Sequence, residues 1–337
     1  MEQSFGSASA LPSSEPQPAA PAARHPIILA YAGQGIDYLG LQFVNWALTL
    51  VTLGFYYPWA RARELNFMIG SLVADRDAFT FHGTGRELFW GFLRAWALFL
   101  LPIAGLGYLM SLPDLGPELE TILMIAFYLV VFVFVMFAIV GSLRYRASRT
   151  SWRGIRFGFD GRFGEFGPAY AVRALAMILS LGLVYPLVAT WRRNYMLTHA
   201  RLGSERFGFD GVAGDLFPSY LPCWFLTLPT LGLSMAWFHG RQQAYFWNHT
   251  TLAGGRFRST LTGGEWLGIT LLNGLLVTFT FGLGAPFAYV NLHREFFGRL
   301  SLEGAELARI HAVASAGTGT GEAAAGLLDV DAGVDIG

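Results

Sequence analysis

The stretch FTFHGTGRELFW, residues 79–90, contains the local unit from which the chain is built. Its first two phenylalanines alternate with polar residues, a period of two that is typical of a half-buried strand. Gly83 and Gly85 follow, and residues without a Cβ let the backbone turn sharply. Glu87 then opens a long apolar run, where its carboxylate would meet the positive end of a helix dipole. The stretch predicts a strand, a glycine turn and an apolar helix that begins with an acid.

The same unit recurs along the chain. Copies begin at residues 29, 79, 157, 207 and 257, with steps of 50 residues except for one step of 78. The turn glycine recurs as Gly161 and Gly211, and the acid recurs as Asp37, Glu165, Asp215 and Glu265. A second landmark keeps this register: Thr-Leu-Gly 52–54, Ser-Leu-Gly 180–182, Thr-Leu-Gly 230–232 and Thr-Phe-Gly 280–282. The pattern predicts internal duplication, one inserted helix in the long step, and a kink or break at each Gly landmark.

Composition indicates a membrane protein. Hydrophobic residues make up 53% of the chain and charged residues only 14%, whereas soluble domains carry roughly 25% charge. Six stretches approach or exceed the roughly 20 residues needed to cross hydrocarbon: 38–60, 88–110, 120–143, 166–190, 216–238 and 266–290. We therefore predict a polytopic α-helical membrane protein with about six transmembrane helices, each preceded by a short strand and a glycine turn.

The two ends differ from the membrane domain, which we place at 25–305. Residues 1–24 are rich in Pro, Ala and Ser and lack the basic start and apolar core of a signal peptide. Residues 312–337 are rich in Gly and Ala and contain no basic residue. Both segments are predicted to be disordered tails.

Two arrangements of the strands relative to the membrane are compatible with the sequence: they alternate between its two faces, or they all lie on one face. Crossing of all six stretches would alternate them between the two faces of the membrane. A single strand is unstable alone, so same-side strands would pair more easily, but the apolar stretches would then have to re-enter, which requires protein around them. Span length favours crossing, while the loop SLPDLGPEL (111–119) stands out because it alone lacks Arg.

Several kinds of chemistry find no support in the sequence. The formal net charge is zero, so we expect no nucleic-acid partner. All basic residues are Arg, which removes lysine chemistry, and the single Cys223 excludes an intrachain disulfide and a Cys/His zinc cluster. Gly83 and Gly85 resemble a dinucleotide loop, but position 88 is Leu where a third glycine is required. We expect no enzyme activity, no cofactor and no metal.

The acids and two arginines inside apolar stretches are the candidates for ion or substrate handling, because charges at membrane depth often mark ion paths. Helix capping is the alternative role for the acids. We expect Glu87 to pair with Arg94, and Glu165 with Arg173, two helical turns apart. The full candidate set is Glu87, Arg94, Glu165, Arg173, Asp215 and Glu265. Gly83, Gly85, Gly161 and Gly211 are predicted to be structural turn residues.

The motif Phe-x-Phe-x-Gly-Thr-Gly-x-Glu-Leu-Phe at 79–89, with Thr-Leu-Gly-Phe-x-x-Pro-Trp-Ala-Arg-x-Arg at 52–63, resembles the YjgN-like bacterial inner-membrane proteins. The resemblance covers roughly 25–305 and implies a multi-pass protein of the bacterial inner (cytoplasmic) membrane with internal repeats. It implies no substrate, cofactor or catalytic residue. The lipid bilayer is the expected partner, and a homo-oligomer is left open. Transport of a small solute or ion, or a structural role in the envelope, are the two functions that these patterns favour.

Overall fold

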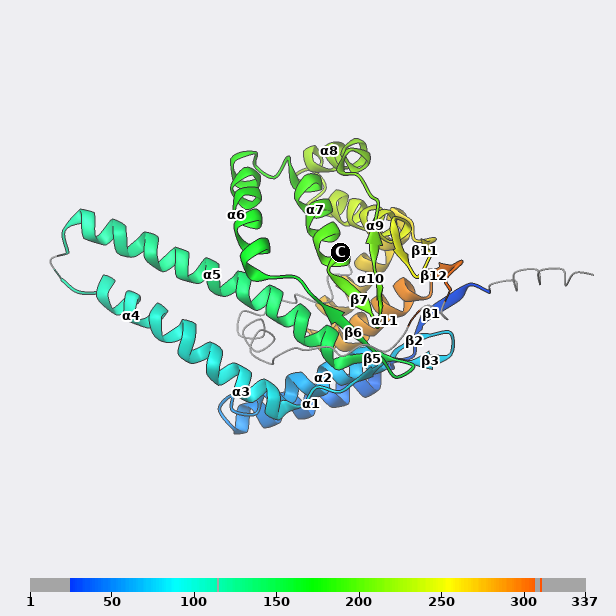
Figure 1. Cartoon of the computed structure of the whole chain (residues 1–337), viewed down its shortest axis with the longest axis horizontal. Helices are drawn as coiled ribbons and strands as arrows, with labels where there is room; N and C mark the ends of the chain where they lie inside the picture. Colours follow the sequence, from blue (N-terminus) through cyan, green and yellow to red (C-terminus); the bar gives the residue numbers. More distant parts are fainter. Residues whose placement is uncertain (1–24, 114, 307–309, 311–337) are drawn as a thin grey trace, which may run out of the picture.

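The computed structural model describes residues 25–306 except residue 114, together with residue 310. The predicted tails, 1–24 and 312–337, lie outside these described residues. Five units follow one another, and each places a pair of helices between two strands (Figure 1).

The bounds of the elements show this common plan. The first unit is β1 (Ile27–Tyr31), α1 (Gly35–Val51), α2 (Tyr57–Gly70) and β2 (Leu72–Ala74). The second is β3 (Asp77–Ala78), β4 (Thr80–Phe81), α3 (Gly85–Ala95), the π-helical η1 (Trp96–Leu100), α4 (Leu101–Met110), α5 (Pro117–Arg149) and β5 (Thr150–Trp152). The third is β6 (Ile155–Phe159), α6 (Phe163–Leu179), α7 (Tyr185–Thr198) and β7 (Ala200–Leu202). The fourth is β8 (Glu205–Arg206), β9 (Gly208–Phe209), the 3-10 turn η2 (Ala213–Leu216), α8 (Phe217–Phe225), α9 (Leu233–Asn248) and β10 (Thr250–Leu252). The fifth is β11 (Gly255–Ser259), α10 (Gly263–Phe279), α11 (Ala285–Phe297) and β12 (Leu300–Glu303).

All strands pair on one side of the helices. The two strands that flank each helix pair are antiparallel partners, as in β1 with β2 and β6 with β7. Seven strands form one sheet, in the order β3-β2-β1-β12-β11-β10-β9, and five form a second, in the order β4-β5-β6-β7-β8. Only Phe79 separates β3 from β4, and only Phe207 separates β8 from β9. The two sheets are therefore joined at both ends, and the first and last units meet through β1 and β12.

The aromatic residues that alternate along the strands form the core beneath the sheets. Phe79 stacks on Phe157 with ring centroids 5.8 Å apart, and Phe157 stacks on Phe207 at 6.4 Å. Phe257, Leu252 and the other inward-facing strand residues pack in the same cluster. Burial of such a side chain contributes roughly 1.5–3 kcal/mol, so the alternation stabilises the junction between units.

The helix pairs fold back on themselves at the Thr/Ser-Leu/Phe-Gly landmarks. In the first unit Leu53 has φ 51° and Gly54 has φ 93°, two consecutive left-handed residues that reverse the chain. The Thr52 hydroxyl donates to the Leu48 carbonyl at 2.7 Å and accepts from the Tyr56 N–H at 3.0 Å. The same left-handed pair occurs at Leu181–Gly182, Leu231–Gly232 and Phe281–Gly282. We call these four elements, α1/α2, α6/α7, α8/α9 and α10/α11, the short hairpins.

The prediction of about six transmembrane helices is wrong. Within the described residues only two helical segments are long and apolar enough to cross a membrane, Gly85–Met110 with 26 residues and Pro117–Arg149 with 33. They correspond to the predicted spans 88–110 and 120–143, and we call them the long hairpin. The predicted spans 38–60, 166–190, 216–238 and 266–290 each run across the turn of a short hairpin. A helix such as α1, with 17 residues, is about 26 Å long at 1.5 Å per residue, and the left-handed pair then ends it.

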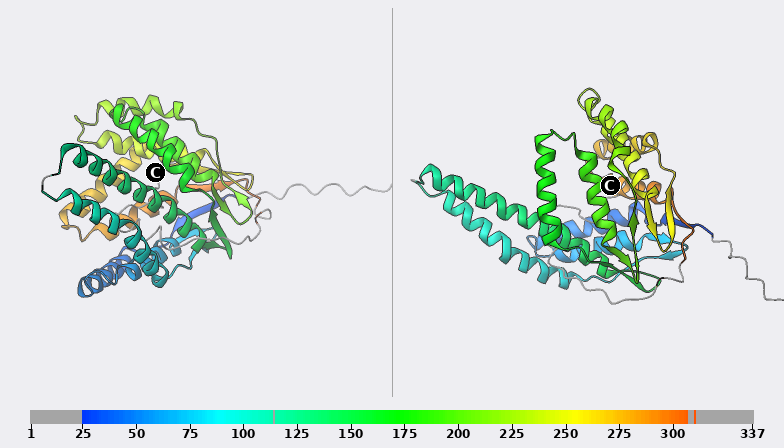
Figure 2. Two further views of the ribbon diagram at one scale, coloured as in Figure 1. Left: turned by 60° about the vertical axis from the view of Figure 1, so that its left-hand side comes forward. Right: turned by 45° about the horizontal axis from the view of Figure 1, so that its top comes forward.

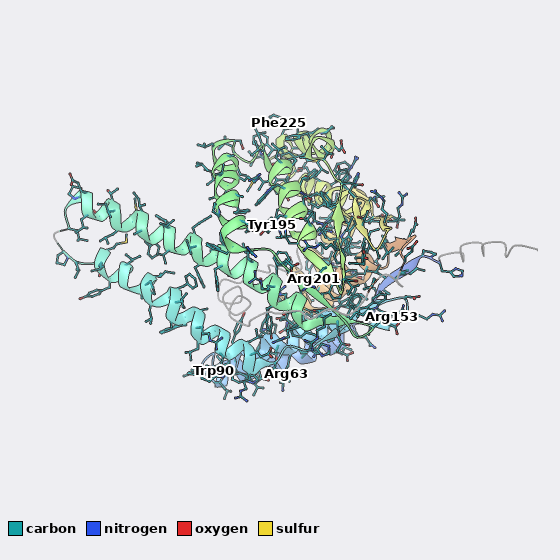
Figure 3. The ribbon with its side chains drawn as sticks, viewed as in Figure 1. Arg63, Trp90, Arg153, Tyr195, Arg201 and Phe225 are labelled. Carbon is teal, nitrogen blue, oxygen red and sulfur yellow. The ribbon has the colours of Figure 1, made fainter. Side chains whose placement is uncertain are left out.

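The hairpins extend to one side of the molecule while the strands gather at the other (Figure 2, left). This arrangement agrees with the same-side alternative for the strands, since all of them lie in the two joined sheets. Figure 3 shows Phe225 at the outer end of the α8/α9 hairpin and Arg153 among the strands. The two ends of the molecule therefore carry different chemistry, apolar at the hairpin ends and charged at the strand turns.

Candidate functional site: a central cavity between the hairpins

A cavity of about 380 Å³ lies where the hairpins meet the strands. The second helix of every hairpin contributes to its wall, and strands β1 and β6 contribute as well. Most of its lining is apolar, including Leu65, Met68, Ile69, Leu143, Leu197 and Phe297. The five units converge on this space, which makes it the candidate site of the protein.

Matching positions of the units face the cavity. The four residues Leu65, Leu143, Arg193 and His293 each lie nine residues before a buried residue of the strand that closes their unit; these strand residues are Ala74, Trp152, Leu202 and Leu302. Residues three and four positions further along each helix share that face, and they include Met68, Arg146, Met196 and Phe296. The lining therefore follows one face of each second helix, and the units differ chiefly in whether that face is apolar or polar.

Arginine, histidine and tyrosine supply the polar part of the lining. Arg146 is buried, with 6% of its surface exposed. The guanidinium of Arg193 lies over the ring of Trp247, 4.6 Å from its centroid, a geometry that stabilises a cation. Among the described residues that line this cavity, none is Asp or Glu. The site is thus an apolar space with cationic groups in its wall.

Tyr31 and His293 form a second polar group in the same wall. Their rings lie 5.3 Å apart, and His293 Nδ1 lies 2.8 Å from the Tyr289 carbonyl oxygen. A neutral imidazole donates from one nitrogen and accepts with the other, so this contact assigns the proton to Nδ1. Burial raises the pKa of Tyr31 to about 12. Its hydroxyl consequently stays protonated and is a hydrogen-bond donor at neutral pH.

The candidate acid of the second unit makes a different ion pair from the one predicted. Glu87 accepts from Arg149 Nε at 3.0 Å and from Arg149 Nη2 at 3.2 Å, and Tyr145 donates to it at 3.3 Å. Arg94 is exposed two helical turns further along α3. The expected pair of Glu87 with Arg94 is therefore wrong, because the fold brings the end of α5 beside the start of α3. The Thr84 hydroxyl accepts from the Glu87 N–H at 3.3 Å and caps the helix.

The third unit repeats this arrangement. Glu165 lies 3.7 Å from His199 Nε2 at the end of the second helix. Arg173 instead lies over the ring of Trp191 at 4.1 Å and donates to the Ala169 carbonyl at 2.8 Å. The expected pair of Glu165 with Arg173 is wrong for the same reason as in the second unit.

Asp215 and Glu265 also bind within their own units. Tyr245 donates to Asp215 at 2.8 Å, and burial first, then this contact, raises the pKa of Tyr245 to about 12. Glu265 and Thr262 form a reciprocal capping box, and the hydrogen bonds from Thr262 lower the pKa of Glu265. Arg299 lies 3.6 Å from Glu265. Each candidate acid therefore links the start of the first helix of its unit to the end of the second helix. Because every contact lies within one unit, the acids do not come together at a common site.

We expect the Glu87 contact to stabilise the second unit modestly. The two side chains are 38% and 23% exposed, and partly exposed ion pairs contribute about 0.2–1 kcal/mol. Glu87→Gln should lower the free energy of unfolding by that amount, while the matched change Arg94→Gln should have no measurable effect. Denaturant unfolding in detergent measures both. Equal losses for the two variants would contradict the assignment of Arg149 as the partner.

The predicted turn glycines are required for close approach. A Cβ on Gly83 would lie 2.5 Å from both the Phe81 ring and the Tyr145 hydroxyl, closer than atoms in real structures come. The same holds for Gly161 against Phe159 and for Gly211 against Phe209. Gly85 packs directly on Trp59. None of these glycines has positive φ, so the physical reason is steric and differs from the sharp turn that was expected.

The sequence patterns did not indicate the residues of the cavity. Arg146, Arg193 and His293 lie in the second helices α5, α7 and α11, outside the strand and glycine motif that recurs along the sequence. Alignment of the segments before β5, β7 and β12 would have placed them at matching or adjacent positions. No group of three or more His, Cys, Asp or Glu side chains in the described part of the chain is arranged to hold a metal ion.

Comparison with known proteins gives a family but no activity. The family described as "Bacterial protein of unknown function (DUF898)" matches residues 26–233 and 219–330. The chain is 29% identical over 136 residues to "Inner membrane protein YjgN" of Salmonella typhimurium, which is 40% of this chain and 32% of that protein. It is 26% identical over 158 residues to the protein of the same name from Escherichia coli K12, covering 46% and 36% of the two chains.

These matches cover only part of each relative. The chain spans about a third of the length of the curated relatives it matches. No solved structure matches it. The relatives are named inner membrane proteins, and their printed names state no substrate or activity.

Proposed function

We propose that this chain, which belongs to the DUF898 family of bacterial proteins of unknown function, is an inner-membrane protein that transports a small solute. Its strand sheets would lie on one face of the membrane, the long hairpin would cross the bilayer, and the short hairpins would re-enter it. The names of its relatives support the inner-membrane location.

The ends of the short hairpins carry the membrane part of the proposal. Each places one large apolar residue at the apex, and its surface is almost fully exposed: Leu53 91%, Leu181 78%, Leu231 93% and Phe281 96%. A bulky residue with positive φ is an outlier in proteins, and such strain clusters at functional positions. The same strained, exposed apolar residue in four hairpins supports insertion into a bilayer, where each side chain would leave water.

Charge supports an orientation with the strands in the cytoplasm. Arg153 makes ion pairs with Asp75 at 2.8 Å and with Asp77 at 2.5 Å at a strand turn. Arg256 binds Asp210 at 2.6 Å and holds the pKa of that carboxyl below its usual value. The loop between α4 and α5, residues 111–116, contains no basic residue. Because Arg is favoured on the cytoplasmic side of short loops, we propose that the strand end lies in the cytoplasm.

The convergence of the five units supports transport. Hairpins that enter a membrane and return are tolerated where they are surrounded by protein or line a water-filled space. In transporters, broken helices of repeated units surround the solute site. Here the second helices of all five units surround one cavity at the base of the hairpins. This arrangement would give a solute a binding place beside re-entrant helices.

A structural role in the envelope is the second candidate, and the acids favour it. Glu87, Glu165, Asp215 and Glu265 each bind a residue of their own unit, so folding explains their presence. Ion handling by these acids, and by Arg94 or Arg173, stays a proposal within the transport model. In both models we propose no catalytic activity.

Uptake by reconstituted protein distinguishes transport from a structural role. Proteoliposomes would be incubated with a bacterial metabolite extract, washed, and analysed by mass spectrometry for enclosed solutes. We expect at least one solute to be enriched over empty liposomes and to fall to background with Arg193→Gln. Arg258→Gln, which changes an exposed arginine on the strands, is the matched control. If no solute is enriched by correctly inserted wild-type protein, the structural role is favoured.

A further inference from the structure

We infer that an exposed face of α3, formed by Arg86, Trp90 and Arg94, binds the headgroup of an anionic phospholipid. We call these three residues the arginine stripe. The inference rests on the proposed placement of the long hairpin across the bilayer, and it does not depend on transport. The lipid belongs to the leaflet on the strand side, because its phosphate lies at the level where the hairpin begins.

The three residues of the arginine stripe lie on one face of α3. They follow one another at intervals of four residues, and residues with this spacing are neighbours on a helix surface. All three are exposed. Trp90 packs edge-on against Phe89, and the ring of Phe89 lies 5.4 Å from that of Trp59 in α2. Trp90 lies at the base of the long hairpin (Figure 3), so the stripe is anchored where this hairpin leaves the other helices.

The fold does not use the two guanidinium groups of the stripe. Neither Arg86 nor Arg94 makes a hydrogen bond, ion pair or ring contact with another residue that the structure describes. Glu87, their nearest acid in the sequence, accepts hydrogen bonds from Arg149 instead. An arginine at membrane depth is costly unless it is paired or reaches the interface. The two cations therefore favour an anion that comes from outside the chain.

The plan of the units does not account for these arginines. In the other units, the position of Arg86 is taken by Ile36, Gly164, Gly214 and Gly264. The position of Arg94 is taken by Val44, Val172, Pro222 and Leu272, and all four of these residues are exposed. The position thus faces outward in every unit, and an uncharged residue serves the fold there. Arginine at both positions occurs only in the second unit, which carries the long hairpin.

The long hairpin places the stripe at the depth of the lipid headgroups. Its first helical segment has 26 residues and is about 39 Å long at 1.5 Å per residue, whereas the hydrocarbon core is about 30 Å thick. The ends of the segment therefore extend into the headgroup region, where Trp is enriched. Arg94 lies one turn deeper than Trp90, and helical side chains tilt toward the N-terminus, which is the strand side here. The guanidinium of Arg94 thus reaches back toward the phosphates.

An anionic phospholipid matches both the charge and the polarity of this surface. Guanidinium groups bind phosphate with two parallel hydrogen bonds, and the stripe offers two such groups about 12 Å apart along the helix. Beyond Arg94 the exposed surface becomes apolar, with Leu98 and Leu101 at 63% and 54% exposure, and it would contact an acyl chain. A soluble anion would contact the arginines alone. A zwitterionic lipid carries its own cation, which the second arginine would repel.

Phosphatidylglycerol with short acyl chains is the probe for the test. The full chain in detergent would be titrated with this lipid, with phosphatidylcholine of the same chain length, and with glycerol phosphate. We expect phosphatidylglycerol alone to raise the unfolding temperature, since a ligand that binds only the folded state stabilises it. Arg86→Gln together with Arg94→Gln should weaken its binding roughly thirtyfold, because each arginine near an anionic headgroup contributes about fivefold.

Two variants control for charge and for folding. Arg258→Gln, which changes an exposed arginine on the strands, should bind phosphatidylglycerol like the wild type. Arg86→Lys together with Arg94→Lys keeps both charges and should retain most of the binding. Because the residues of the stripe are exposed, all these variants should unfold like the wild type when no lipid is added.

Three results would overturn the inference. The first is that phosphatidylcholine or glycerol phosphate stabilises the wild type as much as phosphatidylglycerol. The second is that the double glutamine variant binds phosphatidylglycerol as tightly as the wild type. The third is that native mass spectrometry shows a wild-type dimer that this variant loses while it keeps its lipid, since the arginines would then bind a second copy of the chain.

The lipid site and transport fail in different ways. Phosphatidylglycerol binding that depends on the two arginines, without uptake of any solute by proteoliposomes, supports the lipid site and rejects the proposed transport. Uptake of a solute by a protein whose double glutamine variant still binds phosphatidylglycerol normally rejects the lipid site and leaves transport standing.

Discussion

Single cysteines placed at the strand turns of different units will all be labelled from the cytoplasmic face of the membrane. The strands of all five units belong to two sheets joined at both ends, so their turns cannot lie on opposite faces. A cysteine at Leu112, between α4 and α5, will be labelled only from the other face, because the two helices before and after it are long enough to cross. Suitable strand-side positions are Asp75, Ser204 and Arg258, all exposed.

The labelling reagent is a membrane-impermeant maleimide, applied to intact cells and to inverted membrane vesicles. The background is Cys223→Ser, which removes the one native thiol. Cysteines at the apices, such as Leu53 and Phe281, are expected to react from neither face, although their side chains are 91% and 96% exposed in the folded chain. Labelling that alternates between faces from one unit to the next would reject the arrangement proposed here. Strong labelling of the apices would reject re-entry.

Aspartate at the four apices will destabilise the protein in a bilayer. The same changes will hardly disturb the packing of the folded chain itself. The changes are Leu53→Asp, Leu181→Asp, Leu231→Asp and Phe281→Asp. Each apex side chain makes little contact with the rest of the chain, so the fold loses little core. In the bilayer, an aspartate costs up to about 3.5 kcal/mol at the centre and less near the interface. The four changes lie on four separate hairpins, and costs at sites that do not contact one another add, so together they should lower stability by several kcal/mol.

The measurement is protease resistance on heating in lipid nanodiscs, compared with wild type. Ile28→Asp is the matched control, because Ile28 is also an exposed apolar residue, at 62%, but lies on a strand. Surface changes of that kind usually stay within about 0.5 kcal/mol. If the four-aspartate variant is as stable in nanodiscs as the control, the apices do not enter the bilayer.

Local patterns in the sequence predicted the local structure well. The alternating phenylalanines lie in or beside the strands and pack in the core, and Glu87 and Glu265 lie in the first turns of their helices. The Gly landmarks mark breaks in the helices, as expected. These features depend on a few neighbouring residues, and the physical chemistry of strands, caps and left-handed turns is local.

The predictions that failed required knowledge of contacts between distant residues. Six apolar stretches passed the length test for spans, but that test counts residues and does not see that Leu53 and Gly54 reverse the chain. Glu87 was matched with Arg94 because both lie on one helix, yet the structure brings Arg149, 62 residues away, beside it. The sequence does not indicate the cavity, because Arg146, Arg193 and His293 line one space only when three units pack together.

The sequence by itself indicated the local strand, glycine and helix-start pattern, its recurrence at 50-residue steps and the apolar character of the chain, because each of these follows from short-range periodicity and composition. The tertiary structure alone decided that the strands lie together, that four apolar stretches return as hairpins, and that a cavity forms at their base. The physical reason is strand pairing: backbone hydrogen bonds between β1 and β12 and between the strands of each unit must be satisfied together. This places both ends of every hairpin on the same side.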